Sequence, residues 1–182
     1  MTEEDRRHWD TRYAEGGLAP VGNPIAPPIF APFEDLFPTE GLALEIACGR
    51  GSAALWLASR GMDVYGVDVS PTAIHLAREL LSRSGYAQRA RFEVFDLDNG
   101  LPDSPPVELL LCYNFRDARL DQPMMERLAP RGLLAIATLS EVGAGPGAFR
   151  ARPGELRHAF GKLELLVEGE RDGKAWFVGR RR

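Results

Sequence analysis

The strongest fold signal runs from Leu42 to Asp68 and reads LALEIACGRGSAALWLASRGMDVYGVD. An apolar run over 42–47 leads into Gly49 and Gly51; a helical apolar pattern follows, and a second apolar run ends at Asp68. This order of strand, tight turn, helix, strand and acid is typical of a doubly wound α/β sheet that binds a ligand carrying a ribose.

The glycines fit two kinds of ligand. Gly49, Gly51 and Ala54 satisfy the relaxed Gly-x-Gly-x-x-Gly/Ala pattern with which a dinucleotide fold approaches a pyrophosphate. Glu45 distinguishes between the two kinds of ligand, because a carboxylate in the first strand would repel a pyrophosphate and attract an ammonium or a sulfonium. S-adenosylmethionine (SAM) has both cations, a ribose diol and no phosphate, so the sequence favours SAM over NAD.

Longer segments point the same way. EIACGRG followed by VYGVDVS resembles motif I and the acidic second-strand end of class I SAM-dependent methyltransferases, with Ala47 at the first glycine slot. WDTRYAEGG, CYNFRDARL and RPGELRHAFG resemble the tellurite-resistance-like and thiopurine-methyltransferase-like small-molecule subgroup. The resemblance covers nearly the whole chain and implies a Rossmann-like, mostly parallel seven-stranded sheet of order 3-2-1-4-5-7-6, with the last strand antiparallel and helices on both faces.

Length and composition limit the remaining possibilities. A chain of 182 residues predicts one domain, divided into an N-terminal lid segment (1–40) and a SAM-binding α/β core (41–182). Lys+Arg of 22 against Asp+Glu of 26 lacks the footprint of a nucleic-acid binder. With no signal peptide and no apolar run of about 18 residues, we expect a cytoplasmic protein without a membrane partner, either a monomer or a homodimer.

The cysteines and histidines give no sign of a metal site. Cys48 and Cys112 form no Cys-x-x-Cys pair, and the three histidines are scattered. Both cysteines are therefore predicted to be reduced packing residues.

The predicted elements alternate after a start rich in proline and aromatic residues. That start predicts a short helix near 4–14, an irregular crossing and a short helix near 29–36. Strands are predicted at 42–47, 63–68, 90–96, 107–113, 132–139, 162–168 and 174–180. Helices are predicted at 51–60, 71–84 (with Ser70 as cap and Pro71 at its start), 119–129 (closed by Pro130) and 153–160.

The cofactor residues are expected at the carboxyl ends of the strands. Gly49 and Gly51 would let the backbone pass close to the methionine part of SAM, and Ala47 and Cys48 belong to the same turn. Glu45 would balance the methionine ammonium, and the following helix N-terminus would suit its carboxylate.

Two residues at the end of the second strand are expected to hold the nucleoside. Asp68 would accept both ribose hydroxyls, and Val69 would line the adenine. The alternatives are a buried Glu45 that caps a local turn and an Asp68 that caps the next helix.

The resemblance implies further contacts. Asp96 would accept the adenine amino group and the Leu97 N–H would serve a ring nitrogen; Asp98 competes with Asp96, and both acids could be turn formers. The lid would cover SAM with three residues that share one helical face, or would simply dock by its aromatics; these residues are Trp9, Arg12 and Tyr13.

The end of the fourth strand is expected to border the transferred methyl. Tyr113 and Asn114 would lie there, with Asn114 also touching the cofactor, while Arg116 would bind an anionic substrate or pair with Asp117. Phe115 and Arg116 replace the prolines of the Asn/Asp-Pro-Pro-Tyr/Phe motif, which disfavours methylation of a DNA base or a glutamine amide.

Three functions fit these residues. The first is a methyltransferase acting on a small molecule; no His or Lys base stands out, which fits a soft nucleophile such as a thiol or chalcogen oxyanion. The second is a SAM-binding protein without turnover, acting as a sensor or partner subunit. The third is an NAD-linked oxidoreductase, which Glu45 argues against.

Overall fold

The structure is a computed structural model that describes residues 3–17, 22–147 and 150–182. It divides into two compact units, 1–103 and 104–182. Residues 1–2 and 18–21 of the predicted lid segment, including Pro20, lie outside the described residues. No helix within the described ranges is both long and apolar enough to span a membrane.

The first unit is built on three parallel strands in the order β3-β2-β1: β1 (Leu42–Ile46), β2 (Asp63–Asp68) and β3 (Ala90–Val94). Helix α2 (Ser52–Ser59) joins β1 to β2, and α3 (Pro71–Ser82) joins β2 to β3. Short 3₁₀ helices lie at η1 (Ala31–Leu36), η2 (Ala87–Arg89) and η3 (Leu97–Asn99). β1 and β2 are buried almost throughout, as their continuous apolar sequences require.

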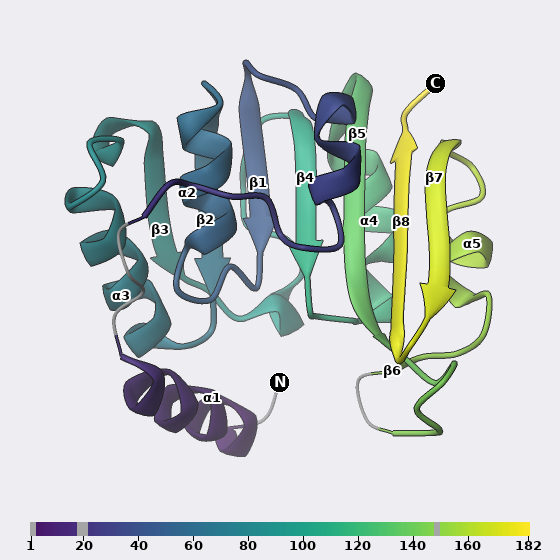
Figure 1. Cartoon of the computed structure of the whole chain (residues 1–182), viewed down its shortest axis with the longest axis horizontal. Coiled ribbons are helices and arrows are strands. Elements are labelled where there is room, and N and C mark those ends of the chain that lie inside the picture. The colour runs from purple at the N-terminus through teal and green to yellow at the C-terminus, as the bar shows by residue number, and fades with distance from the viewer. Residues whose placement is uncertain (1–2, 18–21, 148–149) are drawn as a thin grey trace. The chain divides into compact units, whose positions relative to one another are not determined.

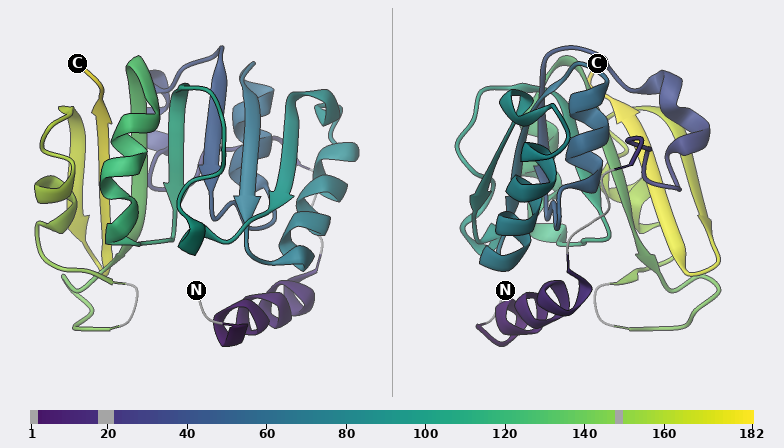
Figure 2. Two further views of the ribbon diagram at one scale, coloured as in Figure 1. Left: turned by 180° about the vertical axis from the view of Figure 1, so that it is seen from behind. Right: turned by 60° about the vertical axis from the view of Figure 1, so that its left-hand side comes forward.

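The N-terminal helix α1 (Glu3–Gly16) lies beyond the carboxyl ends of these strands. Figure 1 shows it past the arrowhead of β2, beside α3, and both views in Figure 2 place it at the same end. Helix α3 begins as predicted: the Ser70 hydroxyl accepts from the Ala73 N–H at 3.0 Å, and Pro71 opens the helix.

The second unit has strands in the order β4-β5-β8-β7: β4 (Val107–Tyr113), β5 (Leu128–Ser140), β7 (Glu164–Arg171) and β8 (Lys174–Arg180). β8 runs antiparallel to both neighbours. Between β4 and β5 lie η4 (Ala118–Leu120) and α4 (Asp121–Arg127), and α5 (Glu155–Ala159) precedes β7. α4 lies behind β5 in Figure 1 and in front of it in the reversed view of Figure 2, so it covers one face.

Both units follow the predicted fold class, and each contains its part of the predicted strand order. One strand was missed: β6 (Arg150–Ala151) pairs with the end of β5, so the predicted sixth and seventh strands are β7 and β8. The β7–β8 turn was predicted correctly, since Asp172 and Gly173 have φ of 51° and 73°, as a type I′ turn requires.

The predicted helix over 119–129 is wrong at its end. α4 stops at Arg127, and Leu128 is already extended with φ −66° and ψ 137°. Pro130 therefore lies inside β5 instead of closing the helix. A residue before proline is pushed towards extended backbone, so Ala129 could not continue a helix.

Candidate cofactor site in the first unit

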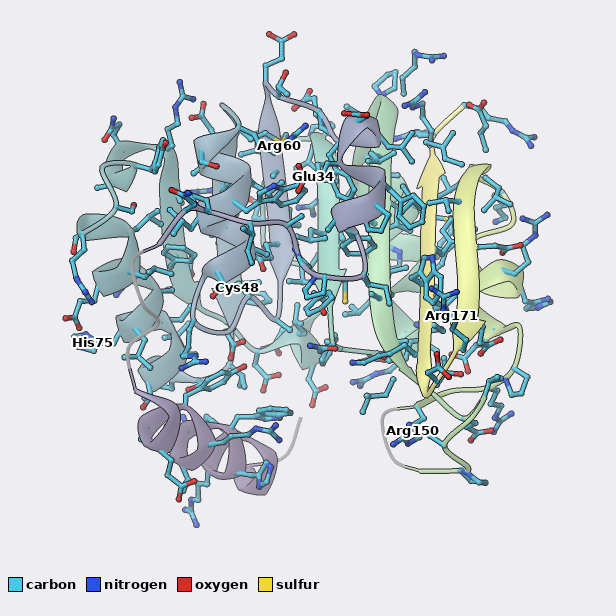
Figure 3. All side chains as sticks on the ribbon, in the orientation of Figure 1. Glu34, Cys48, Arg60, His75, Arg150 and Arg171 are labelled. Atoms are coloured by element: carbon cyan, nitrogen blue, oxygen red, sulfur yellow. The ribbon has the colours of Figure 1, made fainter. Side chains whose placement is uncertain are left out.

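The glycine turn joins the end of β1 to the start of α2. Ala47, Gly49 and Gly51 all have positive φ, at 52°, 52° and 78°. The turn is closed by the Gly51 N–H, which donates to the Cys48 carbonyl at 3.1 Å, and α2 begins with no side-chain cap. Free N–H groups at such a helix start suit a carboxylate. Cys48 is labelled in this turn in Figure 3.

Asp68 ties the two strand ends together. Its Oδ2 accepts from the Gly49 N–H at 2.9 Å, and its Oδ1 accepts from the Ser70 N–H at 3.0 Å. Only 5% of the residue is exposed. Burial raises the pKa of the carboxyl, although these two hydrogen bonds act in the opposite direction. Each oxygen keeps a second lone pair, so the residue has acceptor capacity for a further donor.

Glu45 is buried beside Asp68 with unmet hydrogen-bonding capacity. Burial, followed by the charge of Asp68, raises its pKa to about 8, against a bond from the Ala54 N–H that lowers it. Its Oε2 has no hydrogen-bond partner among the described residues. A buried acceptor without a donor is costly, and a cationic group would relieve both the charge repulsion and the missing bond.

The turn cysteine takes no part in this charge balance. Burial, with Glu45 and Asp68 nearby, raises the pKa of the Cys48 thiol, so it stays neutral. Cys48 and Cys112 are both buried thiols that form no disulfide with each other. No cluster that could hold a metal ion was found among the described residues.

Helix α1 reaches this turn with Tyr13. A Cβ on Gly49 would lie 2.9 Å from the Tyr13 hydroxyl, so the phenol sits directly over the turn. Burial and the charge of Asp68 raise the pKa of Tyr13. Trp9 stacks near Tyr13 at 5.9 Å between ring centroids, and the Arg12 guanidinium lies 5.4 Å from the Trp9 ring. The three predicted lid residues thus share one face, as their spacing indicated.

Two further residues hold α1 in place, and sequence reasoning missed both. Asp10 accepts hydrogen bonds from the Ser70 hydroxyl and, at 3.2 Å, from the Thr72 N–H at the start of α3. Partial burial opposes its ionisation, but these bonds prevail and lower the pKa of the carboxyl. Arg50, between the two glycines, donates to the Gly16 and Gly17 carbonyls at 2.9 Å each. The only sequence signal was a charged residue inside a tight glycine turn.

The other predicted cofactor residues lie at the same edge of the first unit. Val69 is buried next to Asp68, and Leu97 is buried in η3. β3 ends at Val94, two residues earlier than predicted, so Asp96 follows the strand instead of closing it. Asp96 Oδ1 accepts from the Asp98 N–H at 3.0 Å, which is the turn-forming role given as the alternative. Its predicted contact with adenine stays a prediction.

The predicted methyl-bordering residues lie in the second unit. Tyr113 ends β4, and Asn114 follows with a left-handed φ of 64°, which asparagine tolerates. The Asn114 Oδ1 accepts from Lys174 Nζ at 2.7 Å. Burial raises the pKa of Tyr113, so its hydroxyl is protonated at neutral pH.

The predicted surface pair between Arg116 and Asp117 is wrong. The side chain is buried and donates twice to Asp121, at 2.5 and 2.9 Å, and once to Glu155 at 2.7 Å. Three of its five N–H donors thus bond two internal acids, and Asp117 instead pairs with Arg119. Arg116 joins α5 to α4, and its binding of an anionic substrate stays a prediction.

Comparison with known proteins agrees with this geometry. A methyltransferase domain family matches residues 43–132. The chain is 29% identical over 134 residues to ribosomal RNA small subunit methyltransferase C of Chromohalobacter salexigens, covering 70% of this chain and 38% of the relative. It is 33% identical over 99 residues to protein-L-isoaspartate O-methyltransferase of Thermococcus onnurineus, covering 53% of this chain and 44% of the relative. The chain therefore spans less than half the length of these relatives.

Solved structures support the fold. The cyclase SpnF has a TM-score of 0.75 at 14% identity, covering 97% of this chain and 94% of its own. TehB from Haemophilus influenzae has a TM-score of 0.69 at 18% identity, covering 79% and 58%. An S-adenosylmethionine dependent methyltransferase from Mesorhizobium loti has a TM-score of 0.68 at 14% identity, covering 81% and 95%. With the glycine turn, Glu45 and Asp68 in place, residues 43–132 are similar to a methyltransferase domain, as the sequence resemblance to class I SAM-dependent methyltransferases implied.

Proposed function

We propose that this chain is an enzyme that transfers a methyl group from SAM to a small-molecule acceptor. The observation that carries the proposal is the unpartnered, buried Oε2 of Glu45 beside Asp68 at the edge of the glycine turn. Two buried acids at this edge suit a cofactor that brings an ammonium and a ribose, because the ammonium would stabilise the ionised form of Glu45 and the ribose would donate to Asp68.

Each predicted cofactor residue suits a different chemical group of SAM. Glu45 would hold the methionine ammonium, the start of α2 its carboxylate, and Asp68 the ribose hydroxyls. Val69, Leu97 and Asp96 would surround the adenine. When bound, SAM supplies an electrophilic methyl group on its sulfonium.

Helix α1 would close this site. Tyr13 lies over Gly49, and the bonds of Asp10 and Arg50 fix the helix at the carboxyl edge of the strands. A cover at this edge would exclude water and hold the reacting groups in line, which are the main contributions that a methyltransferase makes.

The acceptor is proposed to be a soft nucleophile, either a thiol or a chalcogen oxyanion. Tyr113 is a neutral phenol, because burial raises its pKa, so it is a poor general base. An acceptor that is already nucleophilic needs no base. The relatives' names cover RNA, protein and small-molecule methyltransferases. A net charge of −4 and the absence of the Asn/Asp-Pro-Pro-Tyr/Phe motif favour the small molecule here.

A SAM-consumption assay tests the proposal. Release of S-adenosylhomocysteine would be measured with thiols, selenite, tellurite, phenols and amines, using protein without acceptor as the blank. We expect turnover with at least one thiol or chalcogen oxyanion. Binding of SAM without turnover of any acceptor would instead support the alternative, a SAM-binding protein that acts as a sensor or partner subunit.

A further inference from the structure

Three cations share one cross-strand row in the second unit. Strand register places Lys174 of β8 directly opposite Arg171 of β7 and Leu139 of β5, and Leu139 is also the partner of Arg150 in β6. Residues directly opposite in neighbouring strands project from the same face. The row therefore reads Arg150, Leu139, Lys174, Arg171, and we call its three charged members the cation row.

Neutral groups hold each member of the cation row. Lys174 Nζ donates to the Asn114 Oδ1 at 2.7 Å, and Arg150 Nη1 donates to the Ser140 carbonyl at 2.7 Å. The Arg171 guanidinium lies 5.5 Å from the centroid of the Trp176 ring. Figure 3 labels Arg150 and Arg171 at this end of the second unit.

Within the described ranges, no carboxylate pairs with these three side chains. By contrast, Arg116 and Arg157 of the second unit each contact an acid. Like charges placed directly opposite each other destabilise a sheet. Burial, and then the charge of Arg150 on the far side of Leu139, lowers the pKa of Lys174, so the lysine is repelled from that side of the row as well. The repulsion among these three cations therefore destabilises the folded chain, and a bound anion would reduce it.

The next cross-strand row on the same face places aromatic side chains beside the cation row. Tyr113, Ala137 and Trp176 are directly opposite one another, two residues along from the cation row on the same face. Trp176 is 8% exposed, and its indole N–H has no hydrogen-bond partner among the described residues. Gly169 opposite it has no side chain, so the indole extends over β7.

We propose that Arg150, Lys174 and Arg171 bind an anionic group of the methyl acceptor, a carboxylate or an oxyanion. The site lies at the carboxyl ends of β4 and β5, where ligands of open α/β sheets bind. Lys174 has two N–H donors beyond the one given to Asn114, and each arginine has several, which is enough for a group with two or three anionic oxygens. This identification rests on the proposed function, because it treats the bound anion as the acceptor.

Nuclear magnetic resonance tests the site without turnover. The chain has three tryptophans, so we expect three indole signals from the ¹⁵N-labelled protein, and Trp176→Phe would identify that of Trp176. Sodium benzoate and sodium sulfate would be titrated at constant ionic strength, with neutral benzamide as the shape control. We expect a saturable shift of the Trp176 indole signal with at least one anion and none with benzamide. Benzoate points to an acceptor carboxylate, and sulfate to an oxyanion.

Variants separate the site from general charge. Lys174→Gln and Arg150→Gln should each weaken anion binding about tenfold, the loss of one charge-assisted hydrogen bond. Lys162→Gln is the matched control, since Lys162 is exposed and, among the residues the structure describes, donates to Gln122. No saturable shift with either anion, or equal binding by Lys174→Gln, would overturn the proposal. Titration with S-adenosylhomocysteine tests the proposed function separately, so the two can fail independently.

Discussion

At the residue scale, Asp68 stabilises the glycine turn and is proposed to bind the ribose, so its substitution should lower both stability and ligand affinity. Asp68→Ala removes the acceptor of the buried Gly49 and Ser70 N–H groups, so we expect about 1–3 kcal/mol of lost stability in urea denaturation. Affinity for S-adenosylhomocysteine should fall by roughly 2–3 kcal/mol, because a charged acceptor of two hydroxyls is lost. Asp68→Asn keeps one acceptor oxygen, so its losses of stability and of affinity should both be smaller. Unchanged affinity in Asp68→Ala would reduce this residue to a structural role.

Glu45 predicts a pH dependence with a definite sign. Its pKa is about 8 in the folded chain against an ordinary value of 4.5, so the folded state holds an extra proton between these values. Stability should therefore fall as pH rises from 4.5 to 8, by on the order of 3–5 kcal/mol. Glu45→Gln removes this contribution, and its advantage over the natural chain should grow from pH 5 to pH 9 in urea titrations. Parallel stability curves for the two proteins would contradict the assignment.

Gly51 is required by packing as well as by any ligand. A Cβ there would lie 2.9 Å from the Ala77 Cβ and 3.2 Å from the Phe92 ring, at a φ of 78°. Gly51→Val should thus destabilise the fold by about 2–5 kcal/mol, the sum of left-handed strain and overpacking. Gly145→Ala is the matched control, because it has a φ of 74° and no atom within 4 Å. Equal melting temperatures for the two variants would rule out the packing clash.

At the scale of elements, the predicted lid separates into two parts. Phe30 and Phe37 are buried, and Phe37 packs edge-on against Trp56 of α2 with 5.1 Å between the ring centroids. Arg60 donates to the Glu34 and Phe37 carbonyls, and Figure 3 labels Arg60 and Glu34 close together. This part belongs to the core of the first unit. We therefore expect only α1 to act as a lid, since the hydrogen bonds of Asp10 and Arg50 join it to the first unit at its carboxyl edge.

Hydrogen exchange should distinguish these two parts. Added S-adenosylhomocysteine should slow exchange in α1 and leave 29–38 unchanged. Asp10→Ala should speed exchange in α1 several-fold, because the Ser70 and Thr72 contacts are lost. Glu15→Ala, exposed on the same helix, serves as the control. Ligand-independent exchange in α1 would remove the lid from the account.

Local patterns made most of these elements predictable. The glycine turn, the Ser70 cap and the Asp172-Gly173 hairpin are each set by residues a few positions apart, and all three were predicted from the sequence. The contacts that were missed join distant residues: Asp10 meets Ser70 across 60 positions, and Arg116 meets Glu155 across 39. No spacing rule connects such pairs, because only the tertiary fold brings them together.

At the scale of the whole molecule, the match to a methyltransferase domain supports the fold and the cofactor more firmly than the acceptor. SpnF is a cyclase, yet its fold matches 97% of this chain, so fold alone does not establish methyl transfer. The residues that argue for SAM are Glu45, Asp68 and the glycine turn. Those that argue for an anionic acceptor are Arg150, Lys174 and Arg171.

Isothermal titration calorimetry with S-adenosylhomocysteine tests the central claim most directly. We expect a dissociation constant in the micromolar range, about −8 kcal/mol of binding free energy. At pH 7 the heat should differ between phosphate and Tris buffers, because the ligand ammonium would release the proton of Glu45. Glu45→Gln should weaken binding and abolish most of that difference. A folded chain that gives no heat with S-adenosylhomocysteine or SAM, but binds NAD, would contradict the account.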